Sequence, residues 1–390
     1  MLLWVLVACS STSVDKGGDS AAGSTTSTPA GTTSTGTTPT GRTSTGSTPT
    51  GTTSTGTTPT GTTSTGTTPT GTTPTGTTPT GTTPTGTTPT GTTPTPSCVP
   101  VDPDPGLTSE GHPADGWGWS LGTSVFADHG ASAGDGDLAP ALATTDDGLL
   151  LLFARKNGLE MQLMRARWTV DGWSDPEPVG DIPPSFALYP ALAEDDAGYR
   201  LWVGSGSFDA WSSADGDAWR LDQAGVLRAG GDFDSLSVLY PSVARDGAEW
   251  RMLYTGFDGR TYAIGEAVSD DGLEWSKRGA VIELRVDAWD NTAVAQPALV
   301  QGDSGWWSFY GGYDTSLTDP GPYRIGVARE GVGWEPVGVS VPLGGPGALD
   351  AWSTRDPAVV RTGEGWRMVY AGLGEDGVYR LLEASSDSCG

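Results

Sequence analysis

The second half of this chain repeats one short pattern five times at a constant spacing. Each copy has a proline, and a second apolar run begins nine residues after it. The prolines are Pro140, Pro190, Pro241, Pro297 and Pro357, and the second runs begin at Leu149, Tyr199, Trp250, Trp306 and Trp366. A third apolar run then leads to an acidic-Gly turn and a tryptophan. Short apolar runs separated by turns at a long fixed period are typical of propeller blades. We predict an all-β, five-bladed β-propeller.

The last copy is incomplete, and the missing part lies at the front of the domain. The turn-plus-tryptophan element occurs at Trp173, Trp219, Trp275 and Trp334, but the chain ends before a fifth. A matching element precedes the first proline, at 115–119. We therefore expect the strand near Trp119 to pair with the strand at 379–384 and to close the ring, which removes exposed sheet edges. Cys98 and Cys389 lie just outside these two ends, so we expect a disulfide between them.

The chain divides into three segments by composition. Residues 1–9 are apolar and end in Leu6-Val7-Ala8-Cys9, which resembles a bacterial lipoprotein signal that leaves Cys9 lipidated. No Lys or Arg precedes the apolar run, so a chance apolar N-terminus and a start codon placed too late both stay open. Residues 10–97 are almost entirely Thr, Gly, Ser and Pro, which predicts a disordered linker. Residues 98–390 suit one domain with a sizeable core.

The charge and the histidine count exclude several kinds of function. The net charge of -26 argues against nucleic acid as a partner and against anionic membrane surfaces. Contact with a membrane is therefore expected through the lipid anchor only, in a bacterial envelope protein on the outer membrane or cell surface. Two histidines make a His-rich metal site or a Ser-His-Asp triad improbable. We expect no cofactor, although the plentiful oxygen ligands would suit calcium. We expect a monomer.

The residues directly before the five prolines should face the central channel. They differ chemically, which makes them better functional candidates than repeated residues; they are Ala139, Tyr189, Tyr240, Gln296 and Asp356. We expect Asp356, beside Arg355, to stay ionised. Longer segments at the same end of the ring interleave acidic and aromatic residues, among them Arg155, Asp258, Tyr313 and Asp314. We interpret Asp234, Asp287 and Asp350, with Trp289 and Trp352, as repeated turn and packing residues.

The best copy of the pattern runs from Tyr240 to Trp275 and includes Ile264-Gly265-Glu266-Ala267-Val268-Ser269-Asp270-Asp271-Gly272. It resembles the five-bladed propellers of the arabinanase, levansucrase and invertase type, which are like glycoside hydrolase families 43 and 32. The resemblance implies three carboxylates around the channel. Arg355-Asp356-Pro357 matches an Arg-Asp-Pro motif found in part of that superfamily, where the aspartate helps to stabilise the transition state.

Only one catalytic carboxylate is assigned by a motif. The others could come from Asp290, Asp258 or Asp314, and we select Asp356, Asp290 and Asp258 as candidate catalytic residues. The candidate substrate-binding residues are Arg355, Tyr189, Tyr240, Gln296, Asp314, Tyr313 and Arg155. Glycoside hydrolysis needs a proton donor and a second carboxylate at controlled separation, and this set is incomplete by motif.

Two classes of function stay open. The first is a glycosidase-like protein that acts on or binds a carbohydrate or envelope glycan at the channel mouth. The second is a non-catalytic module, a degenerate relative, that binds a polysaccharide or a protein. A six-bladed, sialidase-like propeller is disfavoured because only five copies of the repeat occur.

Overall fold

The computed structural model describes residues 117–127, 130–184, 188–286, 288–314 and 323–387. Over these ranges the chain forms twenty-one strands and no helix. None of the described residues therefore belongs to a helix long and apolar enough to cross a membrane. Cys9, Cys98, Cys389 and the linker at 10–97 lie outside the described residues, so the lipid anchor, the disulfide and the linker's disorder stay predictions.

Three of the five repeats each form a separate four-stranded antiparallel sheet. The second repeat holds β7 (Pro190–Asp195), β8 (Gly198–Val203), β9 (Ser207–Ser213) and β10 (Arg220–Arg228). The third holds β11 (Ser237–Asp246), β12 (Glu249–Phe257), β13 (Tyr262–Ser269) and β14 (Ser276–Ile282). The fourth holds β15 (Ala293–Gly302), β16 (Gly305–Tyr313), β17 (Tyr323–Glu330) and β18 (Trp334–Val341).

The first and last repeats are joined in one nine-stranded sheet. The first repeat holds β2 (Gly136–Thr145), β3 (Gly148–Asn157), β4 (Glu160–Thr169), β5 (Gly172–Trp173) and β6 (Glu177–Pro178). The last holds β19 (Ser353–Thr362), β20 (Gly365–Leu373) and β21 (Tyr379–Ser386). A single bridge between Gly136 and Tyr379 connects the two groups.

The N-terminal strand lies beside the last repeat. The strand β1 (Ser120–Ser124) pairs antiparallel with β21, and Ser120 lies opposite Ser385. Trp117, which precedes β1, is buried among Trp307, Phe309 and Trp366 from the fourth and last repeats. The most N-terminal described segment therefore supplies an edge strand and a core side chain to the end of the domain.

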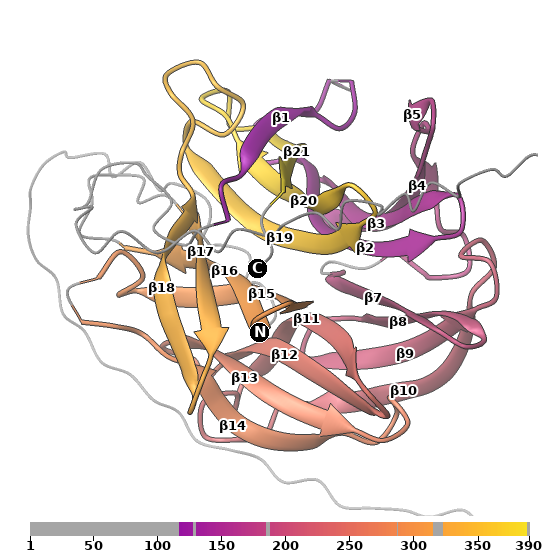
Figure 1. Ribbon diagram of the computed structural model, residues 1–390, viewed down its shortest axis with the longest axis vertical. Helices are drawn as coiled ribbons and strands as arrows, with labels where there is room; N and C mark the ends of the chain where they lie inside the picture. The colour runs from indigo at the N-terminus through magenta and orange to yellow at the C-terminus, as the bar shows by residue number, and fades with distance from the viewer. Residues whose placement is uncertain (1–116, 128–129, 185–187, 287, 315–322, 388–390) are drawn as a thin grey trace, which may run out of the picture. The chain divides into compact units, whose positions relative to one another are not determined.

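The first strand of every repeat lies on the inside of the arrangement (Figure 1). These strands contact one another in the order β2, β7, β11, β15 and β19, and β19 also contacts β2. The residues at and just after the five prolines line one cavity with a volume of about 60 Å³. The five prolines recognised in the sequence therefore converge on a common centre.

In four of the five repeats the proline interrupts the pairing of its strand. A proline has no N–H to donate to a ladder, and in four repeats the register of the first strand shifts across the residue–proline step. The residue before the proline has a positive φ in each of these four, namely Ala139, Tyr240, Gln296 and Asp356. This conformation is rare for residues other than glycine. Because Ala139 shares it, the conformation belongs to the fold rather than to one particular chemistry.

Candidate functional site

Hydrogen bonds link the residues before the prolines across the repeats. The backbone N–H of Ala139 donates to Asp356 Oδ2 at 3.2 Å. The N–H of Asp356 reaches Gln296 Oε1 at 3.5 Å, and the N–H of Gln296 donates to Thr255 Oγ1 at 2.8 Å. Asp356 and Gln296 are both buried. The positive φ at each step therefore aims these groups at one another instead of into a sheet ladder.

Arg355 lies at the centre of a group of tyrosines. Its Nη2 donates to the hydroxyl of Tyr240 at 3.1 Å, and the ring centroid of Tyr240 is 3.8 Å from that of Tyr189. The guanidinium carbon also lies 4.9 Å from the ring centroid of Tyr323 and 5.8 Å from that of Tyr379. Four of the predicted substrate-binding residues, Arg355, Tyr189, Tyr240 and Gln296, are thus brought together around Asp356.

Burial dominates the electrostatics of Asp356. Burial raises the pKa of this carboxyl, while Arg355 and the N–H of Ala139 oppose that rise. We expected Arg355 to keep the carboxyl ionised, but its effect on the pKa is outweighed by the loss of hydration. The Arg355 Nε to Asp356 Oδ1 distance is 3.4 Å, a long contact for an ion pair. Burial likewise raises the pKa of Tyr240 far above its usual range.

Aromatic pairs occur in two consecutive repeats at the end of the sheet where the first strand begins. Phe257 and Tyr262 stack across β12 and β13 at 4.4 Å, and Tyr313 and Tyr323 stack across β16 and β17 at 5.1 Å. Each pair occupies the last residue of the second strand and the first residue of the third. In the last repeat Leu373 faces Tyr379 in the same place. All these side chains are half-buried, so they offer ring surface to a ligand.

Sequence reasoning selected Tyr313 but missed its partner Tyr323, and it also missed Tyr262 and Tyr379. A signal was present in the sequence, because a tyrosine begins the third apolar run in three successive repeats. The lengths of the segments before these tyrosines differ, so a fixed offset from the proline does not reveal them. They become visible once the strand pairing is known.

Two of the candidate catalytic aspartates have structural partners. Asp290 is fully buried, accepts a hydrogen bond from the hydroxyl of Tyr310 at 2.8 Å and pairs with Arg285 at 2.9 Å. Asp258 Oδ1 accepts the N–H groups of Arg260 and Thr261, each at 2.7 Å, as in a turn. These backbone hydrogen bonds hold the pKa of Asp258 below its usual range. Neither arrangement supports a role in proton transfer to a substrate.

The repeated aspartates occur in a different register from the one we expected. Asp234, Asp290 and Asp350 each lie seven residues before a proline, and each accepts a hydrogen bond from a tyrosine twenty residues later. Asp290, rather than Asp287, is thus the equivalent of the other two; Asp287 itself lies outside the described residues. The two Asp-Ala-Trp segments, at 287–289 and 350–352, therefore differ by three residues in their distance from the following proline.

This shift also separates Trp289 from Trp352. Trp289 stacks on Tyr310 with ring centroids 5.6 Å apart, and it covers Gly312 and Gly326, where an added Cβ would meet its ring within 2.5 Å. It is a packing residue, as expected. Trp352 is 40% exposed and is not its equivalent. Trp352 therefore joins the aromatic residues that are open to a ligand.

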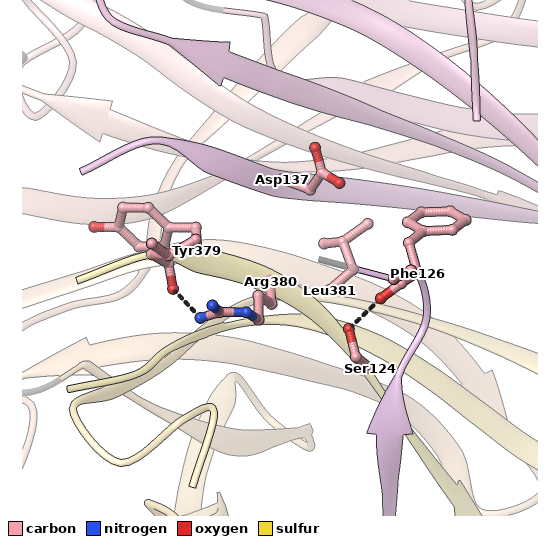
Figure 2. A pocket seen from close by; sticks show the side chains of 8 residues that line it. Ser124, Phe126, Asp137, Tyr379, Arg380 and Leu381 are labelled. Atoms are coloured by element: carbon pink, nitrogen blue, oxygen red, sulfur yellow. Dashed lines mark hydrogen bonds between the residues drawn. The ribbon is translucent and has the colours of Figure 1, made fainter. Parts of the chain in front are cut away.

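Two candidate residues remain, Arg155 and Asp314. Arg155 makes two hydrogen bonds to the buried Asp137, at 2.7 and 2.9 Å. Asp137 in turn lines a small pocket with Tyr379, Arg380 and Phe126, which Figure 2 shows between β2, β21 and the segment after β1. Asp314 is buried. No group of three or more His, Cys, Asp or Glu side chains that could hold a metal ion occurs in the described part of the chain.

Comparison with solved structures identifies the fold. The chain is similar to the catalytic domain of the Coprinopsis cinerea GH62 alpha-L-arabinofuranosidase, with a TM-score of 0.52 and 10% identity over 69% of this chain and 96% of that one. It is also similar to a glycosyl hydrolase from Bacteroides ovatus, with a TM-score of 0.51 and 14% identity over 66% of this chain and 87% of that one. BT0996 in complex with RGII gives a TM-score of 0.52 and 14% identity over 68% of this chain and 90% of that one.

These similarities confirm the predicted resemblance in fold to the propellers of glycoside hydrolases. No protein-family model matches the chain, and no curated protein matches it by sequence. At 10–14% identity the shared property is the fold, so the activity must be argued from the residues of this chain.

Proposed function

We propose that this protein is a carbohydrate-binding propeller that holds an envelope glycan at the channel mouth without cleaving it. The observation that supports this most directly is the presence of two half-buried aromatic pairs, Phe257–Tyr262 and Tyr313–Tyr323, the second of which contacts Arg355 through Tyr323. Ring faces beside a fixed cation and hydroxyl groups suit the apolar faces and the hydroxyls of sugars. The fold shared with carbohydrate-active propellers agrees with such a ligand.

The carboxylates argue against hydrolysis as the main activity. A glycosidase needs an acid and a second carboxylate on opposite sides of the scissile bond. Asp356 is buried and bound to Ala139 and Arg355, Asp290 is bound to Tyr310 and Arg285, and Asp258 belongs to a turn. The raised pKa of Asp356 would suit an acid, and this is the one observation that favours the alternative, a glycoside hydrolase.

The architecture that we propose is a closed ring of five blades. Five prolines around one cavity and the contacts of the inner strands, including β19 with β2, support five repeats around one axis. The pairing of β1 with β21 supports closure by the N-terminal strand. A Cys98–Cys389 disulfide would fasten the same junction.

The location that we propose is the bacterial envelope. A lipid on Cys9 would anchor the chain, and the Thr/Pro/Gly linker would display the propeller at a distance from the membrane. The signal-like run before Cys9 and the polar tract after it support this placement. Loss of membrane association in Cys9→Ala would agree with it, and a wild-type protein that incorporates no labelled fatty acid would exclude it.

Glycan arrays and hydrolysis assays on the purified protein test the function. We expect binding to at least one class of glycan, no new reducing ends, and about tenfold weaker binding for Tyr313→Ala, since a stacked ring contributes about 1–1.5 kcal/mol. The control Val332→Ala changes a fully exposed side chain in the turn between β17 and β18 and should bind as the wild type does. Sugar release that Asp356→Asn abolishes would establish the hydrolase instead. An absence of binding to any glycan would reject both.

A further inference from the structure

A larger pocket lies away from the channel mouth, between the first and last repeats. It has a volume of about 380 Å³ and is formed by the β2–β3 and β19–β20 turns together with the end of β4. Its lining includes Leu149, Trp168 and Arg367. Thr362 in this lining follows Asp356 by six residues along β19, which corresponds to about 20 Å at the usual rise of a strand. The pocket is therefore distinct from the group around Arg355.

Comparison with the other junctions explains why a pocket occurs here. Ten residues after the proline of the second repeat, Arg200 lies over the ring of Trp250 in the third, with 5.7 Å between guanidinium and ring centroid. Arg251 lies in the same way over Trp306 in the fourth repeat, at 4.9 Å. The position that follows the last repeat around the ring holds Leu149, a smaller side chain than tryptophan. Leu149 therefore fills less of this junction than tryptophan fills of these two of the four other junctions, and the pocket lies beside it.

The arginine at this junction also has fewer carboxylate partners than its equivalent. Arg251 pairs with Glu266 on its own repeat and with Glu330 on the next, whose Oε1 lies 2.7 Å from Nη2. Arg367 occupies the equivalent position and pairs through Nη1 with Glu383, the equivalent of Glu266. This contact lacks the alignment of a hydrogen bond, and no other carboxylate pairs with Arg367 among the described residues.

The residue that replaces Glu330 at this junction is Trp168. Arg329 pairs with Trp307 in the fourth repeat, and Arg167 pairs with Leu150 in the first; Glu330 and Trp168 follow these two arginines. The ring of Trp168 lies 4.2 Å from the guanidinium carbon of Arg367 and fixes its position. The chain therefore keeps the arginine and one carboxylate of the Arg251 cluster and omits the second carboxylate.

We propose that this pocket binds a hexuronate unit whose carboxylate acts as a second anionic partner of Arg367, the role that Glu330 has beside Arg251. Arg367 supplies the charge-assisted hydrogen bonds and Trp168 the apolar wall. Thr145, Thr169 and Thr362 also line the pocket, and threonine side chains suit the ring hydroxyls of a sugar. Asp147 and Glu364 also line the pocket, and both are exposed. In the proposed complex they accept hydrogen bonds from the sugar's hydroxyls, and the sugar's carboxylate lies on the buried side near Arg367.

Titration of the full chain with D-glucuronate and with D-glucose, followed by calorimetry, tests this proposal. We expect D-glucuronate to bind at least about tenfold more tightly than D-glucose, because only the acid pairs with Arg367. Arg367→Gln should remove that preference. The matched control Arg278→Gln changes an exposed arginine on β14 and should retain it. Equal affinity for the two sugars, or an absence of D-glucuronate binding, would overturn the proposal.

Two further variants keep the test decisive if Arg367→Gln unfolds. Leu149→Trp should fill the pocket as Trp306 does in the fourth repeat, and Trp168→Glu should restore the second carboxylate beside Arg367. Each should abolish D-glucuronate binding while the melting temperature stays at or above that of the wild type. A folded Leu149→Trp protein that binds D-glucuronate with unchanged affinity would place the ligand elsewhere and overturn the proposal.

Discussion

Tyr310 donates a hydrogen bond of 2.8 Å from its hydroxyl to Asp290 Oδ2, and both side chains are fully buried. The same relationship joins Tyr254 to Asp234 and Tyr370 to Asp350, each at 2.9 Å. The pair ties the segment that enters a repeat to the second strand of that repeat. In the first and second repeats the tyrosine position holds Phe153 and Val203, and the aspartate position holds Ala133 and Pro183. The two positions change together within one chain, which indicates a structural unit.

Tyr310→Phe should destabilise the protein by about 1–3 kcal/mol, because the buried Asp290 loses a hydrogen-bond donor. Glycan binding by the folded variant should be unchanged. Urea unfolding measures the first quantity and calorimetry the second. The control is Phe153→Tyr, which adds a hydroxyl where the chain has no aspartate and should destabilise rather than stabilise. A neutral Tyr310→Phe would mean that Arg285 alone satisfies Asp290.

The stability of the Asp356→Asn variant, relative to that of the wild type, should increase as the pH rises. Burial raises the pKa of Asp356 above the unfolded value of about 3.9. Its contribution to stability is therefore complete below about pH 4 and is lost as the pH rises through the raised pKa. The loss amounts to about 1.4 kcal/mol for each unit by which the pKa is raised. The variant does not titrate at this position and escapes that loss.

Melting temperatures of the two proteins between about pH 4 and pH 8 measure this effect. We expect the difference, variant minus wild type, to grow with pH even if the variant is less stable throughout because Arg355 has lost the negative charge beside it. A difference that shrinks as the pH rises would show that Arg355 lowers the pKa of Asp356 more strongly than burial raises it.

Trp352→Ala should weaken glycan binding about tenfold and leave the melting temperature nearly unchanged, since its ring is 40% exposed. Trp289→Ala should instead lower the melting temperature and leave glycan binding by the folded protein nearly unchanged. Trp289 packs on Tyr310 and over two glycines, so its loss creates a cavity and should cost about 3–5 kcal/mol. Calorimetry and thermal melts on both variants separate the two roles. Equal effects on stability would contradict the distinction between the two tryptophans.

Reduction should lower the melting temperature of the wild type if Cys98 and Cys389 form a disulfide. The bond would close the junction where β1 meets β21, and its loss should cost about 2–5 kcal/mol. The double variant Cys98→Ser/Cys389→Ser should melt at the temperature of the reduced wild type and be insensitive to reductant. Identical melts of the wild type with and without reductant would reject the bond.

The sequence predicted the parts of the fold that depend on local and periodic patterns. Each repeat places similar residues at similar offsets, so the sequence alone reveals the five prolines, the apolar runs and the displaced N-terminal element. Reasoning about the positions before prolines selected Tyr189, Tyr240, Gln296 and Asp356, and the Arg-Asp-Pro motif selected Arg355. The error in the register of Asp287 arose because two Asp-Ala-Trp segments resemble each other locally, whereas hydrogen bonding to a tyrosine twenty residues later decides which aspartates correspond.

The sequence by itself therefore determined an all-β repeat protein, the prolines that line its central cavity and the end at which the N-terminal strand is added. Only the tertiary structure decided that burial opposes the charge of Asp356, that tyrosines surround Arg355 and that Arg367 lacks a second carboxylate. The physical reason is the distance along the chain over which these effects act. The N–H that binds Asp356 belongs to Ala139, 217 residues earlier, and the ring against Arg367 belongs to Trp168 in another repeat. No local pattern encodes such contacts, because they exist only once the repeats have packed together.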